Sequence, residues 1–335
     1  MASRRSTLVK AFCLYPTAVL VAVIAVFIGW MNTHPIPEGV LFATIVPLAN
    51  GRLPATIFGE PAVPLVPAVP DDARPAPRPE NEMFLELPSG AQMPASGLGL
   101  CCRASAYEAE SVRRSVLHYL LLGGRLLDTA QIYLNHRAVG LGIKDAVALG
   151  IPRAEIFVTT KLPPRFFAGD APTEAVRSFL AEGPLGLGLD YLDLVLLHHP
   201  EGFGAGTCAA GTPKECRQNA WKHLTDLRNA GVIRDIGVSN FNMRQFDELG
   251  EVPGAAAVAV NQLQWNPFAP QYQHDVVKAC QARGIAITAW GSFQGTMMQH
   301  GAAFAVTALK SIAEDQGRSV PQVLLRRERC KRGPR

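Results

Sequence analysis

Four side chains suited to acid–base chemistry lie at or just beyond the ends of three apolar runs. They are Asp128, Tyr133, Lys161 and His198. Each run has the leucine, valine and isoleucine content of a buried strand, and helix-length segments separate successive runs. In a (β/α) barrel the carboxyl ends of parallel strands meet at one face, where the active site forms. The sequence therefore predicts that the four side chains share one cavity.

Together these side chains have the chemistry needed to protonate a carbonyl oxygen. A tyrosine, with an ordinary pKa of about 10, is a poor acid near neutral pH unless a cation lowers its pKa. We expect Lys161 to lower the pKa of Tyr133 and Asp128 to pair with the lysine. His198 would orient a carbonyl beside the tyrosine. The four side chains together would protonate the carbonyl oxygen while a nicotinamide transfers a hydride to the carbonyl carbon.

Each of the four residues also has a structural interpretation. Aspartate and lysine on barrel strands often form structural pairs, and a tyrosine after a strand is often a packing residue. His199, beside His198, could simply line the pocket without a role in the chemistry. The occurrence of all four residue types at suitable places favours the catalytic interpretation.

The elements that would position these residues are seven strand–helix units. Apolar periodicity first predicts a β-hairpin at residues 83–94. It then predicts strands at residues 98–102, 126–130, 156–160, 192–197, 233–238, 258–260 and 285–289. A closed barrel has eight strands, and no eighth strand follows the last predicted helix. The predicted fold class is α/β, a (β/α)8 TIM barrel over residues 83–325 with the eighth strand missing.

The last ten residues, 326–335, differ in composition from the predicted barrel. They contain six Arg or Lys residues and one Glu, in a pattern that is neither amphipathic nor β-like. We interpret them as a basic tail unrelated to the domain, such as a shifted reading frame or a splice junction produces. The formal net charge of the chain is +4. This tail accounts for the excess of positive charge, so the rest of the chain is nearly neutral. A nearly neutral chain predicts no nucleic-acid partner.

An uncharged, apolar segment near the N-terminus, residues 11–31, is long enough to cross a bilayer as a helix. We interpret it as an uncleaved transmembrane signal anchor. The positive-inside rule, applied to Arg4, Arg5 and Lys10, predicts a cytosolic tail at residues 1–10 and a lumenal domain in the endomembrane system. The alternative is a cleaved signal, with secretion or plastid targeting as the outcome. Residues 32–82 are rich in proline and are predicted to be an extended linker.

The seven cysteines of the chain do not predict a metal site. They form no C-x-x-C pair and have no histidine at ligand spacing. Cys208 and Cys216 bracket a glycine-containing loop. The sequence leaves open whether this pair forms a disulfide or consists of free thiols.

Five segments resemble the signatures of the aldo-keto reductase family in order and approximate spacing. They are Asp128-Thr-Ala-x-x-Tyr133, Thr-Thr-Lys161, Leu-Leu-His198-His-Pro200, Gly237-Val-Ser-Asn240-Phe and Val260-Asn-Gln262. The resemblance covers residues 83–325. It implies a barrel enzyme that reduces an aldehyde or ketone with NADPH, with NADH left open. Tyr133 would be the general acid of a tetrad that the other three acid–base residues complete.

The resemblance also implies a binding site for the nicotinamide ring. Ser239, Asn240 and Gln262 match residues that hold the nicotinamide carboxamide, and Trp290 lies where the family places an aromatic ring stacked on the nicotinamide. Amide and hydroxyl side chains are complementary to a carboxamide, and an indole offers a large flat face. These residue types agree with the implied roles.

The chain departs from the family pattern at three places. His199 replaces a common tryptophan, and Leu134-Asn-His136 replaces a Gly-Asn-Glu pattern; we expect both changes to alter the pocket more than the chemistry. The basic segment that grips the adenosine 2′-phosphate follows strand eight in the family and is missing here. No G-x-G-x-x-G follows a strand, which argues against a Rossmann dehydrogenase.

The function predicted from these observations is that of a membrane-anchored carbonyl reductase. We expect a monomeric catalytic domain that acts on a small-molecule carbonyl. A non-catalytic binding or regulatory module on the same fold is one alternative, because fold alone does not establish activity. An inactive truncated product is another. The intact tetrad favours the enzyme.

Overall fold

The computed structural model describes residues 67–70, 72–101, 108–201, 211–266, 269–293 and 303–330. They belong to one compact unit, residues 63–335. Seven parallel strands of this unit form one sheet in chain order. The strands are β3 (Leu98–Gly99), β4 (Leu126–Asp128), β5 (Phe157–Leu162), β6 (Leu192–Leu197), β7 (Ile233–Ser239), β8 (Val260–Gln264) and β9 (Ala286–Trp290).

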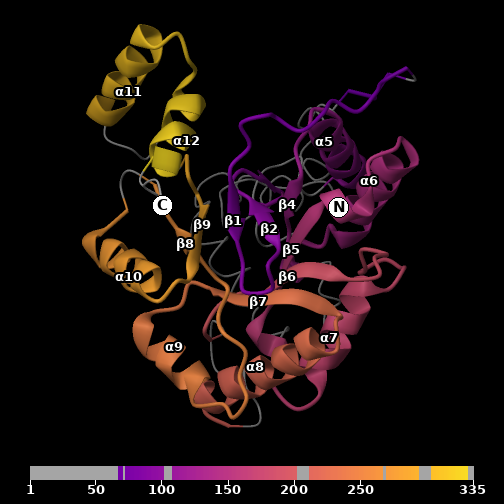
Figure 1. Ribbon diagram of the computed structural model, residues 1–335, viewed down its shortest axis with the longest axis vertical. Coiled ribbons are helices and arrows are strands. Elements are labelled where there is room, and N and C mark those ends of the chain that lie inside the picture. The colour runs from indigo at the N-terminus through magenta and orange to yellow at the C-terminus, as the bar shows by residue number, and fades with distance from the viewer. Residues whose placement is uncertain are drawn as a thin grey trace, which may run out of the picture. The chain divides into compact units, whose positions relative to one another are not determined.

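Helices connect successive strands and lie outside the sheet, as Figure 1 shows. The described α-helices are α5 (Ala109–Leu121), α6 (His136–Ala148), α7 (Ala171–Leu180), α8 (Pro213–Asn229), α9 (Met243–Gly250), α10 (Gln271–Ala282), α11 (Ala303–Asp315) and α12 (Val320–Cys330). Short 3₁₀ helices are η2 (Gln131–Tyr133), η3 (Arg153–Glu155) and η4 (Pro164–Phe166). Capping boxes at Thr212 and Asn242 begin α8 and α9 by satisfying the first backbone N–H groups.

The seven strands and their order confirm the prediction of a parallel barrel-type sheet. A hydrogen bond from Gln262 of β8 to Asp128 at the end of β4 shows that the sheet curls. In the sheet order, β5, β6 and β7 separate these two strands. Among the described residues, β3 and β9 are the edge strands of the sheet, and no parallel strand follows β9. The structure is therefore a seven-stranded near-barrel.

Several predicted strand boundaries differ from the observed ones by one to four residues, and the difference at β8 has a physical reason. Strand β8 begins at Val260 and includes Asn261 and Gln262, whereas residues 258–260 were predicted. The polar side chains suggested a strand end, but Asn261 is buried and donates to the carbonyl of Phe241. Helix α12 continues to Cys330 and therefore includes residues 326–330 of the predicted tail. Arginine and glutamate are good helix formers, which explains the continuation.

A β-hairpin closes the floor of the near-barrel, as predicted. It consists of β1 (Phe84–Glu86) and β2 (Gln92–Pro94), joined by a turn in which Gly90 has φ of +83°. Ser89 in this turn donates through its backbone and its hydroxyl to the carboxylate of Asp235 in β7. A second buried cluster fills the interior above it: Leu87, Met93, Leu126, Phe157, Leu194, Leu196, Ala259 and Val260. The hairpin therefore occupies the end of the strands opposite the candidate site.

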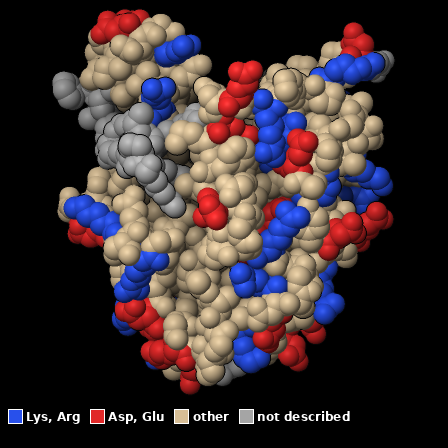
Figure 2. Space-filling view, in the orientation of Figure 1, with Lys and Arg blue, Asp and Glu red and all other residues tan. Residues whose placement is uncertain are grey.

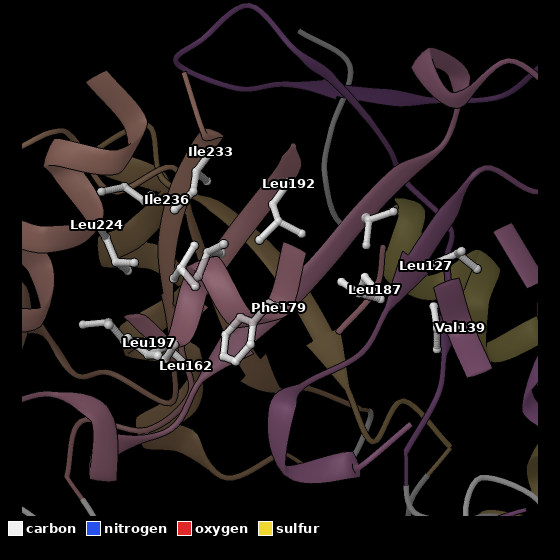
Figure 3. Packing of buried hydrophobic residues seen from close by; sticks show 14 of the residues in the cluster. Leu127, Val139, Leu162, Phe179, Leu187, Leu192, Leu197, Leu224, Ile233 and Ile236 are labelled. Atoms are coloured by element: carbon white, nitrogen blue, oxygen red, sulfur yellow. The ribbon is translucent and has the colours of Figure 1, made fainter. Parts of the chain in front are cut away.

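The main core lies between the strands and the outer helices. Figure 3 shows part of it, including Leu127 of β4, Val139 of α6 and Phe179 of α7. Burying each such side chain stabilises the fold by about 1.5–3 kcal/mol. Gly140 permits close packing of α6, since a Cβ there would overlap the carbonyl oxygen of Leu187.

Part of the predicted Pro-rich linker packs against the domain. Val69 and Ala73 contact the main core, and Ala76 N–H donates to the carbonyl of Leu121 at 2.7 Å. Arg78 donates to the backbone carbonyl of Glu155 at 2.5 Å. Residues 67–70 and 72–82 therefore contribute to the folded unit, whereas the rest of the predicted linker lies outside the described residues.

The predicted signal anchor, residues 11–31, and the cytosolic tail also lie outside the described residues. Within the described part of the chain, no helix combines the length and the apolar character that crossing a membrane requires. Basic and acidic side chains are interspersed over the face in Figure 2. The described residues contain no group of three or more His, Cys, Asp or Glu side chains able to hold a metal ion.

Candidate active site

Lys161 is the centre of the candidate site and is almost completely buried. Its ammonium nitrogen donates to Asp128 Oδ1 at 2.6 Å, to the backbone carbonyl of Thr129 at 3.0 Å and to the hydroxyl of Tyr133 at 3.3 Å. Strands β4 and β5 pair in parallel and place Asp128, the last residue of β4, beside Thr159, two residues before Lys161. The fold thus places three of the four predicted acid–base residues in direct contact.

Charge compensation keeps Lys161 protonated despite its burial. Burial by itself lowers the pKa of Lys161, but the nearby Asp128 carboxylate and the Tyr133 hydroxyl more than offset this effect, and the pKa is raised. The lysine is therefore a fixed positive charge beneath the tyrosine. Among the effects that raise this pKa, the charge of Asp128, whose Oδ1 lies 2.6 Å from the ammonium nitrogen, is the largest.

The prediction for the pKa of Tyr133 is corrected in its net direction. Burial raises the pKa of Tyr133, and the positive charge of Lys161 lowers it, but burial is the larger effect. The pKa of the hydroxyl is consequently raised above 10. Sequence reasoning identified the lysine and had no measure of the desolvation that opposes it.

His198 completes the group at the end of β6. Its ring lies edge-on to Tyr133, with centroids 5.8 Å apart and an interplanar angle of 81°. Burial, together with the charge of Lys161, lowers the pKa of His198 well below 6.5, so the imidazole is neutral at physiological pH. Within the described part of the chain, His198 Nδ1 is buried without a hydrogen-bond partner.

The residues predicted to hold a carboxamide form a second connected group at the ends of β7 and β8. Ser239 donates through its hydroxyl to the carbonyl of Gln262 at 3.0 Å, and Asn240 Nδ2 donates to the Ser239 hydroxyl at 3.0 Å. Gln262 Nε2 donates to Asp128 Oδ2 at 2.7 Å. Asp128 therefore links this group to Lys161, because its two carboxylate oxygens accept from different residues.

Trp290 lies beside this group at the end of β9. Its Nε1–H donates to Asn240 Oδ1 at 3.0 Å, and the residue is 37% exposed. The hydrogen bond fixes one edge of the indole while part of the residue remains open to solvent. All four predicted cofactor-binding residues thus lie in one hydrogen-bonded group.

Two residues in the left-handed backbone region shape the turns at the site. Leu134, with φ of +55°, ends η2 directly after Tyr133, and Asn240, with φ of +65°, follows β7. Asparagine tolerates this region better than most residues, whereas leucine is strained there. The strained Leu134 occupies the position where the family pattern has glycine.

Sequence reasoning missed the residues that support the turn carrying Tyr133. Asn135 accepts from the Thr129 hydroxyl at 2.7 Å and donates to the carbonyl of Leu100 at 2.8 Å. His136 Nδ1 lies 3.1 Å from the carbonyl of Leu185 and Nε2 lies 2.9 Å from the Thr160 hydroxyl. A carbonyl only accepts, so Nδ1 carries the proton and Nε2 accepts from the threonine. At His136 the departure from the family pattern was the available signal, whereas Asn135 agrees with that pattern.

Comparison with known proteins gives one consistent family. The model of the aldo/keto reductase family matches residues 97–326. Aldo-keto reductase AKR2E4 of Bombyx mori is 35% identical over 257 residues, 72% of this chain and 78% of that protein. Glyoxal reductase of Bacillus subtilis is 33% identical over 244 residues, with 72% and 77% covered. The crystal structure of the Bombyx mori protein in complex with NADP matches with a TM-score of 0.61 at 30% identity, covering 75% of this chain and 80% of that one.

Proposed function

Because the chain belongs to the aldo/keto reductase family, we propose that it reduces an aldehyde or ketone to an alcohol with NADPH, using Tyr133 as the general acid. The observation that carries the proposal is the contact of the Tyr133 hydroxyl with the buried ammonium of Lys161 at 3.3 Å. The names of relatives support the chemistry, since they include a glyoxal reductase and an NADPH-dependent codeinone reductase.

The described residues divide the proton chemistry among them. Tyr133, whose raised pKa keeps it protonated at neutral pH, gives its proton to the carbonyl oxygen. Lys161 stabilises the resulting tyrosinate, and Asp128 holds the lysine in place through the 2.6 Å hydrogen bond. Neutral His198 orients the carbonyl through one N–H. NADPH, when bound, supplies the hydride that is added to the carbonyl carbon.

The residues around Gln262 fit the nicotinamide end of such a cofactor. Gln262 uses its Nε2 to bind Asp128, and within the described residues its Oε1 has no hydrogen bond. This oxygen can accept from the amide nitrogen of a carboxamide. Trp290, being partly exposed, offers its indole for stacking. Ser239 and Asn240 complete the wall on which the ring would rest.

Turnover by the full chain tests the proposal. Purified protein is mixed with NADPH and an aromatic aldehyde, and the loss of NADPH absorbance is followed; NADH in a parallel reaction tests the cofactor preference. Sustained oxidation that requires the aldehyde supports the reductase. Tight NADPH binding without turnover favours the non-catalytic binding module, and neither binding nor turnover favours the inactive product.

We also propose that the domain is lumenal and anchored by residues 11–31. Cys101 and Cys216 each take part in a disulfide bond, and disulfides are typical of oxidising compartments. Cys208, a proposed partner of Cys216, lies outside the described residues. Extraction of membranes with alkaline carbonate tests the anchor, and protease protection in sealed vesicles tests the orientation. Release by carbonate, or digestion of the domain without detergent, contradicts the proposal.

The catalytic domain is proposed to act as a monomer. One chain supplies Asp128, Tyr133, Lys161 and His198, so no second subunit is needed to complete the group. Light scattering of detergent-solubilised protein measures the mass, and activity that depends on protein concentration would oppose this proposal.

A further inference from the structure

His199 follows the tetrad histidine at the end of β6 and contacts both parts of the candidate site. Its ring is stacked on His198, with centroids 4.9 Å apart and an interplanar angle of 9°. Its Nδ1 lies 3.2 Å from Nδ2 of Asn240. The histidine is therefore a direct link between the acid–base residues and the wall formed by Ser239, Asn240 and Gln262.

The orientation of the Asn240 amide is fixed by Trp290. The indole N–H can only donate, so the atom that it meets at 3.0 Å is the amide oxygen of Asn240. The amide nitrogen then faces Nδ1 of His199, the Ser239 hydroxyl and, at 3.2 Å, the backbone carbonyl of His198. Because this nitrogen only donates, Nδ1 of His199 must accept, and the proton of the neutral ring resides on Nε2.

We propose that His199 is a positioning residue for the nicotinamide wall, and that only its neutral form can accept a hydrogen bond from Asn240. Protonation puts a hydrogen on Nδ1 of His199, so that this N–H and the amide N–H of Asn240 face each other as two donors without an acceptor. Rotating the Asn240 amide does not resolve this conflict, since it would place the amide nitrogen against the indole N–H of Trp290. The stacking partner of the nicotinamide is thus coupled to the charge of His199. This inference rests on the proposed binding of NADPH.

The surroundings of His199 set the direction of the pH dependence. Burial and the positive charge of Lys161 lower the pKa of His199 below 6.5. The neighbouring His198 has its pKa lowered further, in part by Lys161 and Arg165, and Asp128 is held by the lysine. Above pH 6.5 His199 is neutral and the hydrogen bond to Asn240 is present. As the pH falls through this lowered pKa, His199 becomes charged, the bond is lost, and the wall loses one of the contacts that hold Asn240.

The first test uses unliganded full-length protein. Trp290 emission is obtained as the difference between the wild type and a Trp290→Phe variant, and is titrated from about pH 8 to about pH 5. We expect a transition below pH 6.5 in the wild type and its absence in His199→Gln, whose amide oxygen can accept from Asn240 and does not titrate. The same transition in His199→Gln overturns the inference.

The second test measures binding of NADP⁺, which withstands acid. From about pH 8 to about pH 5 we expect the affinity of the wild type to fall roughly fivefold more than that of His199→Gln, the effect of one hydrogen bond. Titration of the cofactor phosphate affects both proteins alike and cancels.

His199→Phe, which keeps a ring against His198 but lacks the acceptor, should bind NADP⁺ weakly at every pH. Equal pH dependence in wild type and His199→Gln refutes the role. Failure to bind NADP⁺ at any pH refutes the proposed function, and the emission titration then decides the coupling by itself.

Discussion

Replacing Tyr133 by phenylalanine removes one hydroxyl and should separate catalysis from stability. The hydroxyl accepts one hydrogen bond, from Lys161 at 3.3 Å, and a contact of this length contributes at most about 1 kcal/mol to stability. Lys161 keeps its two shorter hydrogen bonds, to Asp128 and to the carbonyl of Thr129, so its charge remains compensated. We therefore expect a small loss in the free energy of unfolding, measured by chemical denaturation.

The expected effect on turnover is much larger. The substitution removes the proposed general acid, so the rate should fall by about 10²–10⁴-fold. NADP⁺ affinity should stay nearly unchanged, because Tyr133 donates no hydrogen bond to Ser239, Asn240 or Gln262. Steady-state NADPH oxidation measures the rate and Trp290 quenching measures the affinity. A rate within about tenfold of the wild type would refute the acid role.

Tyr191→Phe is the matched control. The Tyr191 hydroxyl is buried and has no hydrogen-bond partner among the described residues. Its ring lies between Arg153 and Arg234, whose guanidinium carbons are each 4.2 Å from the ring centroid. Removing an unsatisfied hydroxyl should leave turnover intact and stabilise the fold by about 1 kcal/mol. Loss of turnover in this control would mean that the rate responds to distant changes in packing.

Three other perturbations follow from the structure. Burial raises the pKa of Tyr133 above 10, so the rate of reduction should show no loss of the acid up to about pH 10, and a decline centred near neutrality would contradict this. Gly140→Ala should lower the free energy of unfolding by about 1–3 kcal/mol, because its Cβ overlaps a backbone carbonyl, whereas Gly250→Ala, with open space around it, should not. Burial lowers the pKa of His136 from 6.5 to about 4; the unfolded chain then binds more protons, so stability present above pH 6.5 falls as the pH drops toward 4. The free energy of unfolding should be about 2 kcal/mol lower near pH 5, and this loss should be absent in His136→Gln. The same dependence of the free energy of unfolding on pH in wild type and His136→Gln would refute this prediction.

The sequence alone located the candidate site along each strand. An apolar run that ends in a polar residue marks both a buried strand and its carboxyl end, which is why Asp128, Lys161 and His198 could be assigned to one face before any contact was known. The same reasoning failed at β8, because Asn261 and Gln262 lie inside the strand. A buried asparagine with a backbone partner looks, in sequence, like the end of a strand.

Only the tertiary structure decided which of these atoms meet. Gln262 and Asp128 are 134 positions apart, and they bond because the curl of the sheet brings β8 across to β4. The pKa of Tyr133 depends on a balance between burial and the charge of Lys161, and neither quantity can be obtained from residue types. The link from His199 through Asn240 to Trp290 likewise depends on atoms from three strand ends. Hydrophobic pattern fixes the face on which a side chain lies, whereas hydrogen bonding and desolvation depend on distances of a few ångströms between segments that only folding brings together.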